Sequence, residues 1–203
     1  MFEIEQELYF EGHKHIACID EVGRGCLYGD VVAGAVILPA GLTIDGVKDS
    51  KKLSEKKREK LFDIIRDEAV AYGFGVVSPE IIDKINIKQA TRLAMKLALQ
   101  NLRDKEGNRI SPSYILVDAE EVESNIPQKA VIDGDNLVHG ISAASILAKV
   151  YRDRMCQEWD MVHPGYDLAK NKGYGTKNHR DALVELGPTN KHRMTFLKNI
   201  LKG

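Results

Sequence analysis

The chain has 203 residues, of which 43% are hydrophobic and 29% charged, and its formal net charge is −1. This length and composition indicate an ordinary globular protein with a substantial core. No stretch has the apolar length of a membrane span, and the acidic start MFEIEQELYFEG lacks the features of a secretory signal. The three cysteines, Cys18, Cys26 and Cys156, have no metal-type spacing. We therefore expect a reducing, cytoplasmic setting.

Charge is distributed unevenly along the chain. Residues 48–60 hold seven basic and three acidic side chains, and residues 170–203 hold eight basic and two acidic ones. Acidic side chains gather near the N-terminus and again at residues 118–123. Basic segments beside acidic clusters suit a surface that binds phosphate around a metal centre, although most charge runs are solvated helix faces. Charge alone leaves both interpretations open.

The first half of the chain predicts a hairpin followed by alternating elements. Residues 15–20 and 31–38 have the apolar runs of two strands, and a glycine-rich turn joins them. A polar helix over 54–68 and a valine-bearing strand over 70–78 follow. Ser78-Pro79-Glu80 is typical of a helix start, and the apolar spacing after it predicts one helix to about residue 102.

The second half adds a strand, a long helix and a tail. Residues 103–113 are a turn-rich connector, 114–119 predict a short strand, and 141–155 predict a helix. The segment HPGYDLAKNKGYGTK predicts an irregular loop, with two short helices after it. This order predicts an α/β fold with a mixed sheet. We expect a single domain over 1–203, in which about 160–203 form a helical C-terminal extension.

Carboxylates stand where two predicted strands end. Asp20 and Glu21 follow the apolar run 16–19, Asp118 ends YILVD, and Asp135 precedes the predicted helix within IDGDN. Side chains alternate along a strand, so Asp20 and Glu21 cannot both point into one site from regular strand geometry. Either the strand ends at Asp20 and Glu21 turns back, or only one of them is a primary ligand.

Four carboxylates that converge at strand ends repel one another unless a hard cation neutralises them. Oxygen-only ligand sets favour magnesium or manganese over zinc. Two such ions are the usual apparatus for in-line attack on a phosphodiester. A single aspartate at a strand end is more often a turn former or a helix cap, so these residues alone leave a metal site and a structural role both open.

Seven blocks of the sequence follow one another along the chain: IDEVGRG, the following GDVVAGAVIL, VKDSKKLSEKKREKLF, DKINIKQAT, VDA, GDNLVHGISAASILAKVYRDR, and KGYGTKNHRDAL with GPTNKHRMTF. Block by block and in this order, they resemble the ribonuclease HII family. The resemblance extends from about residue 13 to residue 196. It implies a ribonuclease H-like fold, a mixed sheet flanked by helices. It also implies cleavage of the RNA strand of RNA–DNA hybrids, and cutting 5′ of single ribonucleotides in duplex DNA to leave 3′-hydroxyl and 5′-phosphate ends.

The resemblance also implies roles for particular residues. The family's acidic quartet, which holds two divalent ions (Mn²⁺ or Mg²⁺), falls on Asp20, Glu21, Asp118 and Asp135. Its Gly-Arg-Gly triplet falls on Gly23, Arg24 and Gly25, and its junction-sensing tyrosine on Tyr174. Ser50, Lys51 and Lys52 lie in a matched block, where the lysines would bind the nucleic-acid backbone as charge.

Physical chemistry supports the role of the triplet. A 2′-hydroxyl can donate and accept hydrogen bonds, and glycines leave backbone amides and carbonyls accessible to a sugar edge. Arg24 offers a fork of donors to a phosphate. Tyr174 offers a flat ring that can stack on a sugar or base, although an ordinary packed loop tyrosine would look the same in sequence.

The chain departs from the family pattern at several positions. Cys26 replaces a proline after the triplet, Asp30 replaces the proline of Gly-Pro, Ala119 replaces the glycine of VDG, and Asp133 replaces the lysine of Lys-Gly-Asp. Asp133 adds a negative charge near the fourth acid, which could alter the metal preference or the metal affinity. None of these changes removes a catalytic carboxylate.

Several alternatives stay open at this point. The chain could be a nuclease of the same fold that acts on another nucleic-acid structure, or a binding module that no longer cleaves. His139 and His192 fit either proton transfer or structural hydrogen bonding. A nucleophile built from Ser145 and Lys149 has little beyond helical spacing behind it, and residues 142–145 favour close helix packing. We expect a monomer without membrane contact, and the sequence does not say whether FLKNILKG docks a replication partner.

Overall fold

A computed structural model describes residues 3–47 and 53–201. Its centre is a five-stranded sheet in the order β3-β2-β1-β4-β5. The strands are β1 (Ile16–Val22), β2 (Val31–Ile37), β3 (Ala71–Val77), β4 (Tyr114–Asp118) and β5 (Gln128–Val131). The pairs β1–β2 and β2–β3 are antiparallel, and β1–β4 and β4–β5 are parallel. The predicted mixed sheet, and the hairpin within it, are confirmed.

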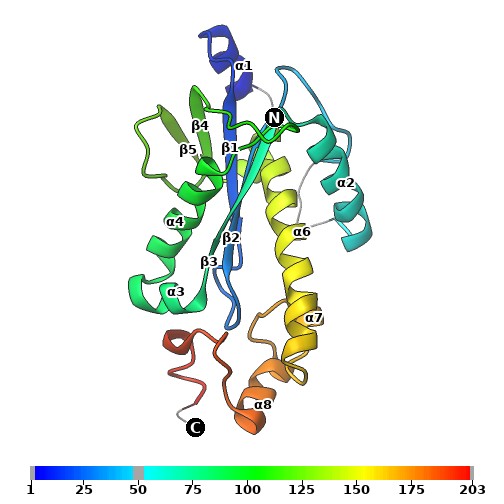
Figure 1. Ribbon diagram of the computed structural model, residues 1–203, viewed down its shortest axis with the longest axis vertical. Helices are drawn as coiled ribbons and strands as arrows, with labels where there is room; N and C mark the ends of the chain where they lie inside the picture. Colours follow the sequence, from blue (N-terminus) through cyan, green and yellow to red (C-terminus); the bar gives the residue numbers. More distant parts are fainter. Residues whose placement is uncertain (1–2, 48–52, 202–203) are drawn as a thin grey trace.

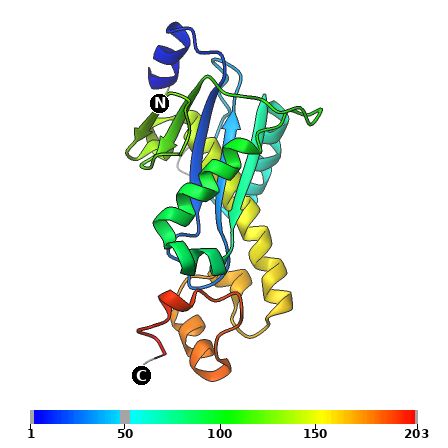
Figure 2. The same cartoon turned by 60° about the vertical axis from the view of Figure 1, so that its left-hand side comes forward.

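Helices cover both faces of this sheet (Figure 1, Figure 2). They are α1 (Glu3–Phe10), α2 (Glu55–Glu68), α3 (Pro79–Ile85), α4 (Ile87–Gln100), α5 (Gly134–Leu137), α6 (His139–Val162), α7 (Leu168–Asn171) and α8 (Lys177–Leu186), with a 3₁₀ turn at Met194–Phe196. In β1, Ile16 and Cys18 pack with α2 and α6, whereas Ala17 and Ile19 pack with α4. This alternation buries both faces of the central strand.

Glycines let the helices approach the sheet closely. A Cβ atom added at Gly34 in β2 would lie 2.8 Å from the carbonyl oxygen of Ala144 in α6. One added at Gly75 in β3 would lie 1.9 Å from the carbonyl oxygen of Ala94 in α4. Both distances are below van der Waals contact, so these helices rest on the sheet backbone itself. The expected close packing of residues 142–145 is confirmed.

The prediction of one helix up to about residue 102 is wrong in one respect, because this segment forms two helices. Asn86 lies between α3 and α4 with φ 69°, a left-handed conformation that no continuous helix contains. Its side-chain oxygen accepts a hydrogen bond from the Gln89 N–H at 3.1 Å and caps α4. Apolar spacing alone does not reveal such a break, because both helices bury apolar residues.

Several other elements differ from the prediction. The N-terminal helix α1 and the short edge strand β5, whose sequence is QKAV, were not predicted. Helix α6 is longer than residues 141–155 at both ends. The predicted loop in the tail contains α7, and the two helices expected after it are α8 and only a 3₁₀ turn.

The C-terminal part packs under the turn that joins β1 and β2. Its small apolar cluster contains Leu27 and Tyr28 from that turn, with Tyr166, Leu168 and Leu183 from the tail. It lies at the end of the molecule away from α1 (Figure 1). That residues 1–203 form one domain stays a prediction. Within residues 3–47 and 53–201, no helix combines the length and apolarity needed to cross a bilayer.

Candidate active site

The first and fourth strands bring two predicted acids together. Strands β1 and β4 run parallel with Ile19 opposite Val117, so Asp20 and Asp118 follow at the same edge of the sheet. A cavity of about 270 Å³ opens there. The residues that line it are Asp20, Glu21, Val22, Gly23, Arg24, Gly25, Asp118, Ser145, Lys149 and Tyr174. Apart from Asp135, every predicted site residue in the described ranges lines this cavity.

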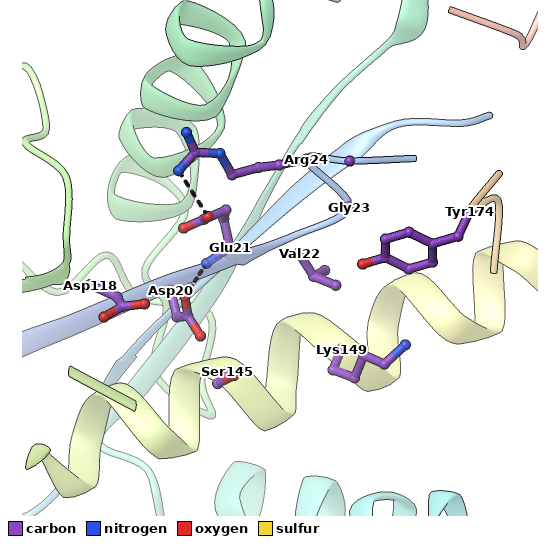
Figure 3. Close-up of a pocket in the computed structure, with 10 residues that line it drawn as sticks. Asp20, Glu21, Val22, Gly23, Arg24, Asp118, Ser145, Lys149 and Tyr174 are labelled. Carbon is purple, nitrogen blue, oxygen red and sulfur yellow. Dashed lines mark hydrogen bonds and ion pairs between the residues drawn. The ribbon is translucent and has the colours of Figure 1, made fainter. Parts of the chain in front are cut away.

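Asp20 and Glu21 keep the alternation of a regular strand. Strand β1 continues to Val22, so the alternative in which the strand ends at Asp20 is wrong. Asp20 points towards Ser145 on α6, whereas Glu21 points the other way, towards Arg24 (Figure 3). The Glu21 N–H donates to Asp20 Oδ1 at 2.7 Å, and Arg24 Nη1 lies 3.4 Å from Glu21 Oε1. Both carboxylates nevertheless line the same cavity, from two sides of the strand end.

Burial and mutual repulsion raise the pKa of both carboxyl groups. Asp20 is 6% exposed, and its pKa lies well above the ordinary value because of burial first and then the charges of Glu21 and Asp118. A hydrogen bond from the Ser145 side chain acts in the opposite direction. Burial also raises the pKa of Glu21, against the opposing charge of Arg24. The site therefore holds negative charge that its surroundings do not fully stabilise.

Asp118 and Asp135 are connected through the start of α5. The Gly134 N–H donates to Asp118 Oδ1 at 2.7 Å, and the next residue, Asp135, is 2% exposed. Asp135 does not line the cavity. Asp133, one of the departures from the family pattern, has φ 60° and accepts a hydrogen bond from Asn136 Nδ2 at 2.7 Å.

The donor set fits a hard divalent cation. In the parts of the chain that the structure covers, no three His, Cys, Asp or Glu side chains are drawn together as a closed metal site. Carboxylates at one strand end repel one another, and this repulsion adds to the effect of burial in raising the pKa of Asp20 and Glu21. The ligands that face the cavity are carboxylate oxygens, which magnesium and manganese prefer.

The Gly-Arg-Gly triplet forms one wall of the cavity and rests on a buried arginine. Gly23 has φ +92°, and a Cβ atom there would lie 2.3 Å from Arg152 Nε. Arg152 is fully buried and donates to the carbonyls of Tyr28 at 3.0 Å, Asp30 at 2.9 Å and Lys172 at 2.7 Å. Any side chain at Gly23 would displace this guanidinium and the turn that it holds.

Tyr174 forms the opposite wall, from the loop between α7 and α8. Its side chain is 42% exposed and faces Gly25, where an added Cβ would lie 3.9 Å from the tyrosine Cε1. The Leu27 N–H donates to the Gly173 carbonyl at 2.8 Å and ties the two walls together. The structure therefore brings the triplet, Tyr174 and three of the four acids to one place.

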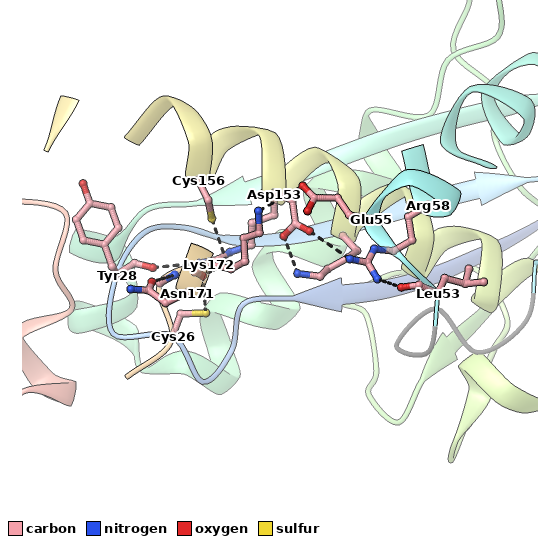
Figure 4. A network of polar contacts seen from close by, with 12 residues as sticks. Cys26, Tyr28, Leu53, Glu55, Arg58, Asp153, Cys156, Asn171 and Lys172 are labelled. Atoms are coloured by element: carbon pink, nitrogen blue, oxygen red, sulfur yellow. Dashed lines mark hydrogen bonds and ion pairs between the residues drawn. The ribbon is translucent and has the colours of Figure 1, made fainter. Parts of the chain in front are cut away.

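Two residues of α6 line the cavity although the sequence argument gave them little weight. Ser145 and Lys149 are one helical turn apart, and this spacing was the available signal. Lys149 Nζ is 2.6 Å from Asp153 Oδ1, and Arg58 Nη2 of α2 approaches the same carboxylate at 3.8 Å (Figure 4). Ser145 donates a hydrogen bond to Asp20. Ser145 and Lys149 therefore bond to carboxylates, which is not the arrangement of a Ser-Lys nucleophile.

A second set of ion pairs contacts Arg24 from outside the cavity. Glu120, 9% exposed, lies 3.6 Å from Arg24 Nη2 and 3.2 Å from Arg92 Nε. It belongs to the acidic run at residues 118–123 and was not predicted to take part.

The remaining predicted residues lie elsewhere. His139 and His192 are buried away from the cavity, and His139 Nε2 accepts from the Ile44 N–H at 3.1 Å. These contacts favour the structural interpretation of both histidines. Ser50, Lys51 and Lys52 lie outside the described residues.

Comparison with known proteins identifies the family. The sequence model of ribonuclease HII matches residues 17–199. The ribonuclease HII of Alkaliphilus oremlandii is 61% identical over 199 residues, which are 98% of each chain. The crystal structure of ribonuclease H2 from Pyrococcus horikoshii has a TM-score of 0.74 and 26% identity, and covers 93% of this chain and 97% of that one. The ribonuclease HII in the PCNA:RNase HII complex from Archaeoglobus fulgidus gives the same values.

These matches agree with the fold and with the resemblance found in the sequence blocks. The neighbours confirm the ribonuclease H-like fold, and the family match extends over nearly the whole chain. The protein therefore belongs to the ribonuclease HII family, metal-dependent hydrolases of phosphodiester bonds that cleave the RNA strand of RNA–DNA hybrids.

Proposed function

We propose that this protein, besides cleaving hybrids, cuts duplex DNA on the 5′ side of a single embedded ribonucleotide. The observation that carries the proposal is the shared cavity, in which the Gly-Arg-Gly backbone, Tyr174 and the strand-end acids face one space. A group that detects a 2′-hydroxyl must lie close to the cleaving groups if sugar identity is to set the cut position. The products are 3′-hydroxyl and 5′-phosphate ends.

We assign Asp20, Glu21, Asp118 and Asp135 as the ligands of two divalent ions, Mn²⁺ or Mg²⁺. Such ions, when bound, supply activation of the attacking water and stabilisation of the leaving 3′-oxygen. Burial first, and then the charges of neighbouring carboxylates, raise the pKa values of Asp20 and Glu21, and a bound cation would offset both effects, which supports this assignment. Ser145 fixes one oxygen of Asp20 through its hydrogen bond.

The protein's other residues bind and orient the nucleic acid. Arg24 is 42% exposed and can share its fork of donors between Glu21 and a phosphate. The Tyr174 ring, held opposite Gly25, can stack on the sugar or base next to the ribonucleotide. Lys51 and Lys52 remain proposed phosphate contacts, with salt-sensitive binding as their signature.

The test is a gel assay on end-labelled duplex DNA that carries one ribonucleotide, with an all-deoxy duplex as control. Each duplex is incubated with magnesium, manganese or chelator, and with the wild type or the Asp118→Asn variant. We expect one metal-dependent cut 5′ to the ribonucleotide, absent from the control duplex and from the variant.

Other outcomes separate the alternatives. Binding without a cut in either metal would refute the catalytic proposal and favour a binding module. Equal cutting of the all-deoxy duplex would keep the acids but remove the 2′-hydroxyl sensor, as expected of a nuclease directed at another structure.

A further inference from the structure

A chain of hydrogen bonds connects two buried histidines to the loop that carries Tyr174. His179, in the first turn of α8, is 0% exposed, and His192 is 2% exposed. His179 Nδ1 lies 2.9 Å from the Tyr174 carbonyl oxygen, and the Nε2 atoms of the two rings are 3.2 Å apart. His192 Nδ1 lies 2.9 Å from the backbone nitrogen of Thr189. Neither ring lines the cavity.

The two ends of this chain fix the positions of the protons independently. The Thr189 N–H can only donate, so His192 Nδ1 accepts and a neutral ring carries its proton on Nε2. The Tyr174 carbonyl can only accept, so His179 Nδ1 donates and its Nε2 is a bare acceptor. In the middle, the His192 Nε2–H therefore faces the unprotonated His179 Nε2. The assignments from the two ends agree.

The surroundings keep both rings uncharged. The ring of Tyr28 meets that of His192 edge-on with centroids 4.7 Å apart, and the ring of Tyr166 lies 5.0 Å away on another side. Burial lowers the pKa of His179, and it lowers that of His192 to about 4. A proton added to either ring would set two N–H groups against each other.

This chain of hydrogen bonds connects the two walls of the cavity. The Gly29 N–H donates to the Lys191 carbonyl, and the Arg193 N–H to the Leu27 carbonyl, each at 2.9 Å. These bonds fix the segment that carries His192 to the turn that follows the Gly-Arg-Gly triplet. At the His179 end, the hydrogen bonds hold the Tyr174 carbonyl, which also accepts from the Thr176 N–H at 2.8 Å.

We propose that His179 and His192 are positioning residues, which form a neutral, one-way hydrogen-bond relay that fixes the Tyr174 loop relative to the Gly-Arg-Gly turn. They contact no substrate and act through Tyr174. The proposal rests on the role assigned above to Tyr174. Its expected consequence is that loss of the relay weakens discrimination between ribonucleotide-containing and all-deoxy duplexes.

The first experiment observes the relay in the wild-type protein. Long-range ¹H–¹⁵N NMR spectra at neutral pH, assigned with single histidine variants, distinguish the two neutral tautomers from the charged ring. We expect His179 to carry its proton on Nδ1 and His192 on Nε2. The opposite tautomer, or a charged ring at either position, would overturn the relay whatever the role of Tyr174.

The second experiment measures the dissociation constants of one-ribonucleotide and all-deoxy duplexes in chelator, by fluorescence anisotropy. Loss of one hydrogen bond in His179→Leu should reduce the ratio of the all-deoxy to the one-ribonucleotide dissociation constant about three- to tenfold. His179→Asn, whose amide N–H can replace Nδ1–H but not the acceptor Nε2, should lose less than His179→Leu. His163→Asn is the matched control, because His163 Nδ1 bonds the Tyr28 hydroxyl at 2.6 Å and has no contact with the Tyr174 loop among its described hydrogen bonds.

The same substitutions in a Tyr174→Ala background separate the two proposals. If His179 acts through Tyr174, then His179→Leu should change the ratio no further in that background. An equal loss in both backgrounds would overturn the positioning role. A Tyr174→Ala variant that discriminates as well as the wild type would overturn the role of Tyr174 and leave the histidines nothing to position, with the NMR result unaffected.

Discussion

Two polar regions on either side of the cavity differ in how their buried ionisable groups are stabilised. At the edge of the sheet, Asp20 and Glu21 are buried beside like charges, and burial first and then these charges raise their pKa values. Beneath the Tyr174 loop, His179 and His192 are neutral, and each ring nitrogen has a partner. The difference shows two roles for buried polar groups. Carboxylates that repel one another suit a cation site, whereas side chains with all their hydrogen bonds made suit a rigid support for a loop.

The largest expected effect comes from removing one carboxylate of the acidic site. The variant Asp20→Asn should lose about 10³-fold in cleavage rate, because a proposed metal ligand is gone. In chelator it should be more stable than the wild type by about 1 kcal/mol, because one of the repelling charges is gone. Thermal melts in chelator check the stability, with the exposed Asp45→Asn as control. A lower melting temperature for Asp20→Asn would contradict the account of the site.

A buried acid outside both regions sharpens the comparison. Glu5 of α1 accepts from the Gly140 N–H at 3.2 Å, and burial raises its pKa to about 7 from 4.5. The folded state therefore binds more protons between these values, so stability should fall by up to about 3 kcal/mol as pH rises from about 4.5 to 7. Glu5→Gln should remove this slope in urea titrations over that pH range. Glu7→Gln, exposed on the same helix, should keep it.

The histidine region should respond to pH in the opposite direction. The pKa of His192 is lowered from 6.5 to about 4, so the unfolded state binds more protons between these values. This histidine should cost up to about 3 kcal/mol of stability as pH falls from about 6.5 to 4. His192→Asn keeps an acceptor for the Thr189 N–H and lacks the titration. If wild type and variant lose stability in parallel over this range, the depressed pKa is wrong.

The smallest expected effect concerns the support of Arg24. Glu120→Gln removes a charge 3.6 Å from a guanidinium that is 42% exposed, so we expect binding of a hybrid in chelator to change only about two- to fivefold. Anisotropy at two salt concentrations measures it. Glu123→Gln, which removes an exposed partner of Lys96, is the matched control and should leave binding unchanged.

The sequence predicted those features that strong periodicity or position determines. The hairpin, the third strand and the strand ending in Asp118 all have apolar runs bounded by turn residues. Acids stand near the end of β1 and at the end of β4. The apolar runs do not show that β1 and β4 are neighbours. The structure shows that they pair in parallel, and this register sets Asp20 beside Asp118.

The rest depended on contacts that a pattern does not contain. Strand β5 is a four-residue edge strand that is stabilised by its neighbour, and α1 has only eight residues, of which Glu5 and Leu8 are buried. The break at Asn86 needs a left-handed residue, which apolar spacing does not indicate. Ser145 looked like a packing residue because its hydrogen bond to Asp20 arises only when α6 lies across β1.

Gly34 sets the height at which that helix lies. It pairs with Asp20 across β1 and β2, and on its open side it meets the backbone of Ala144 and Ala148. A single methyl group there would act as a wedge between sheet and helix, and would lift Ser145 away from the carboxylate that it orients. The accuracy of the acidic site thus depends partly on the absence of a side chain at Gly34, a residue that does not line the cavity.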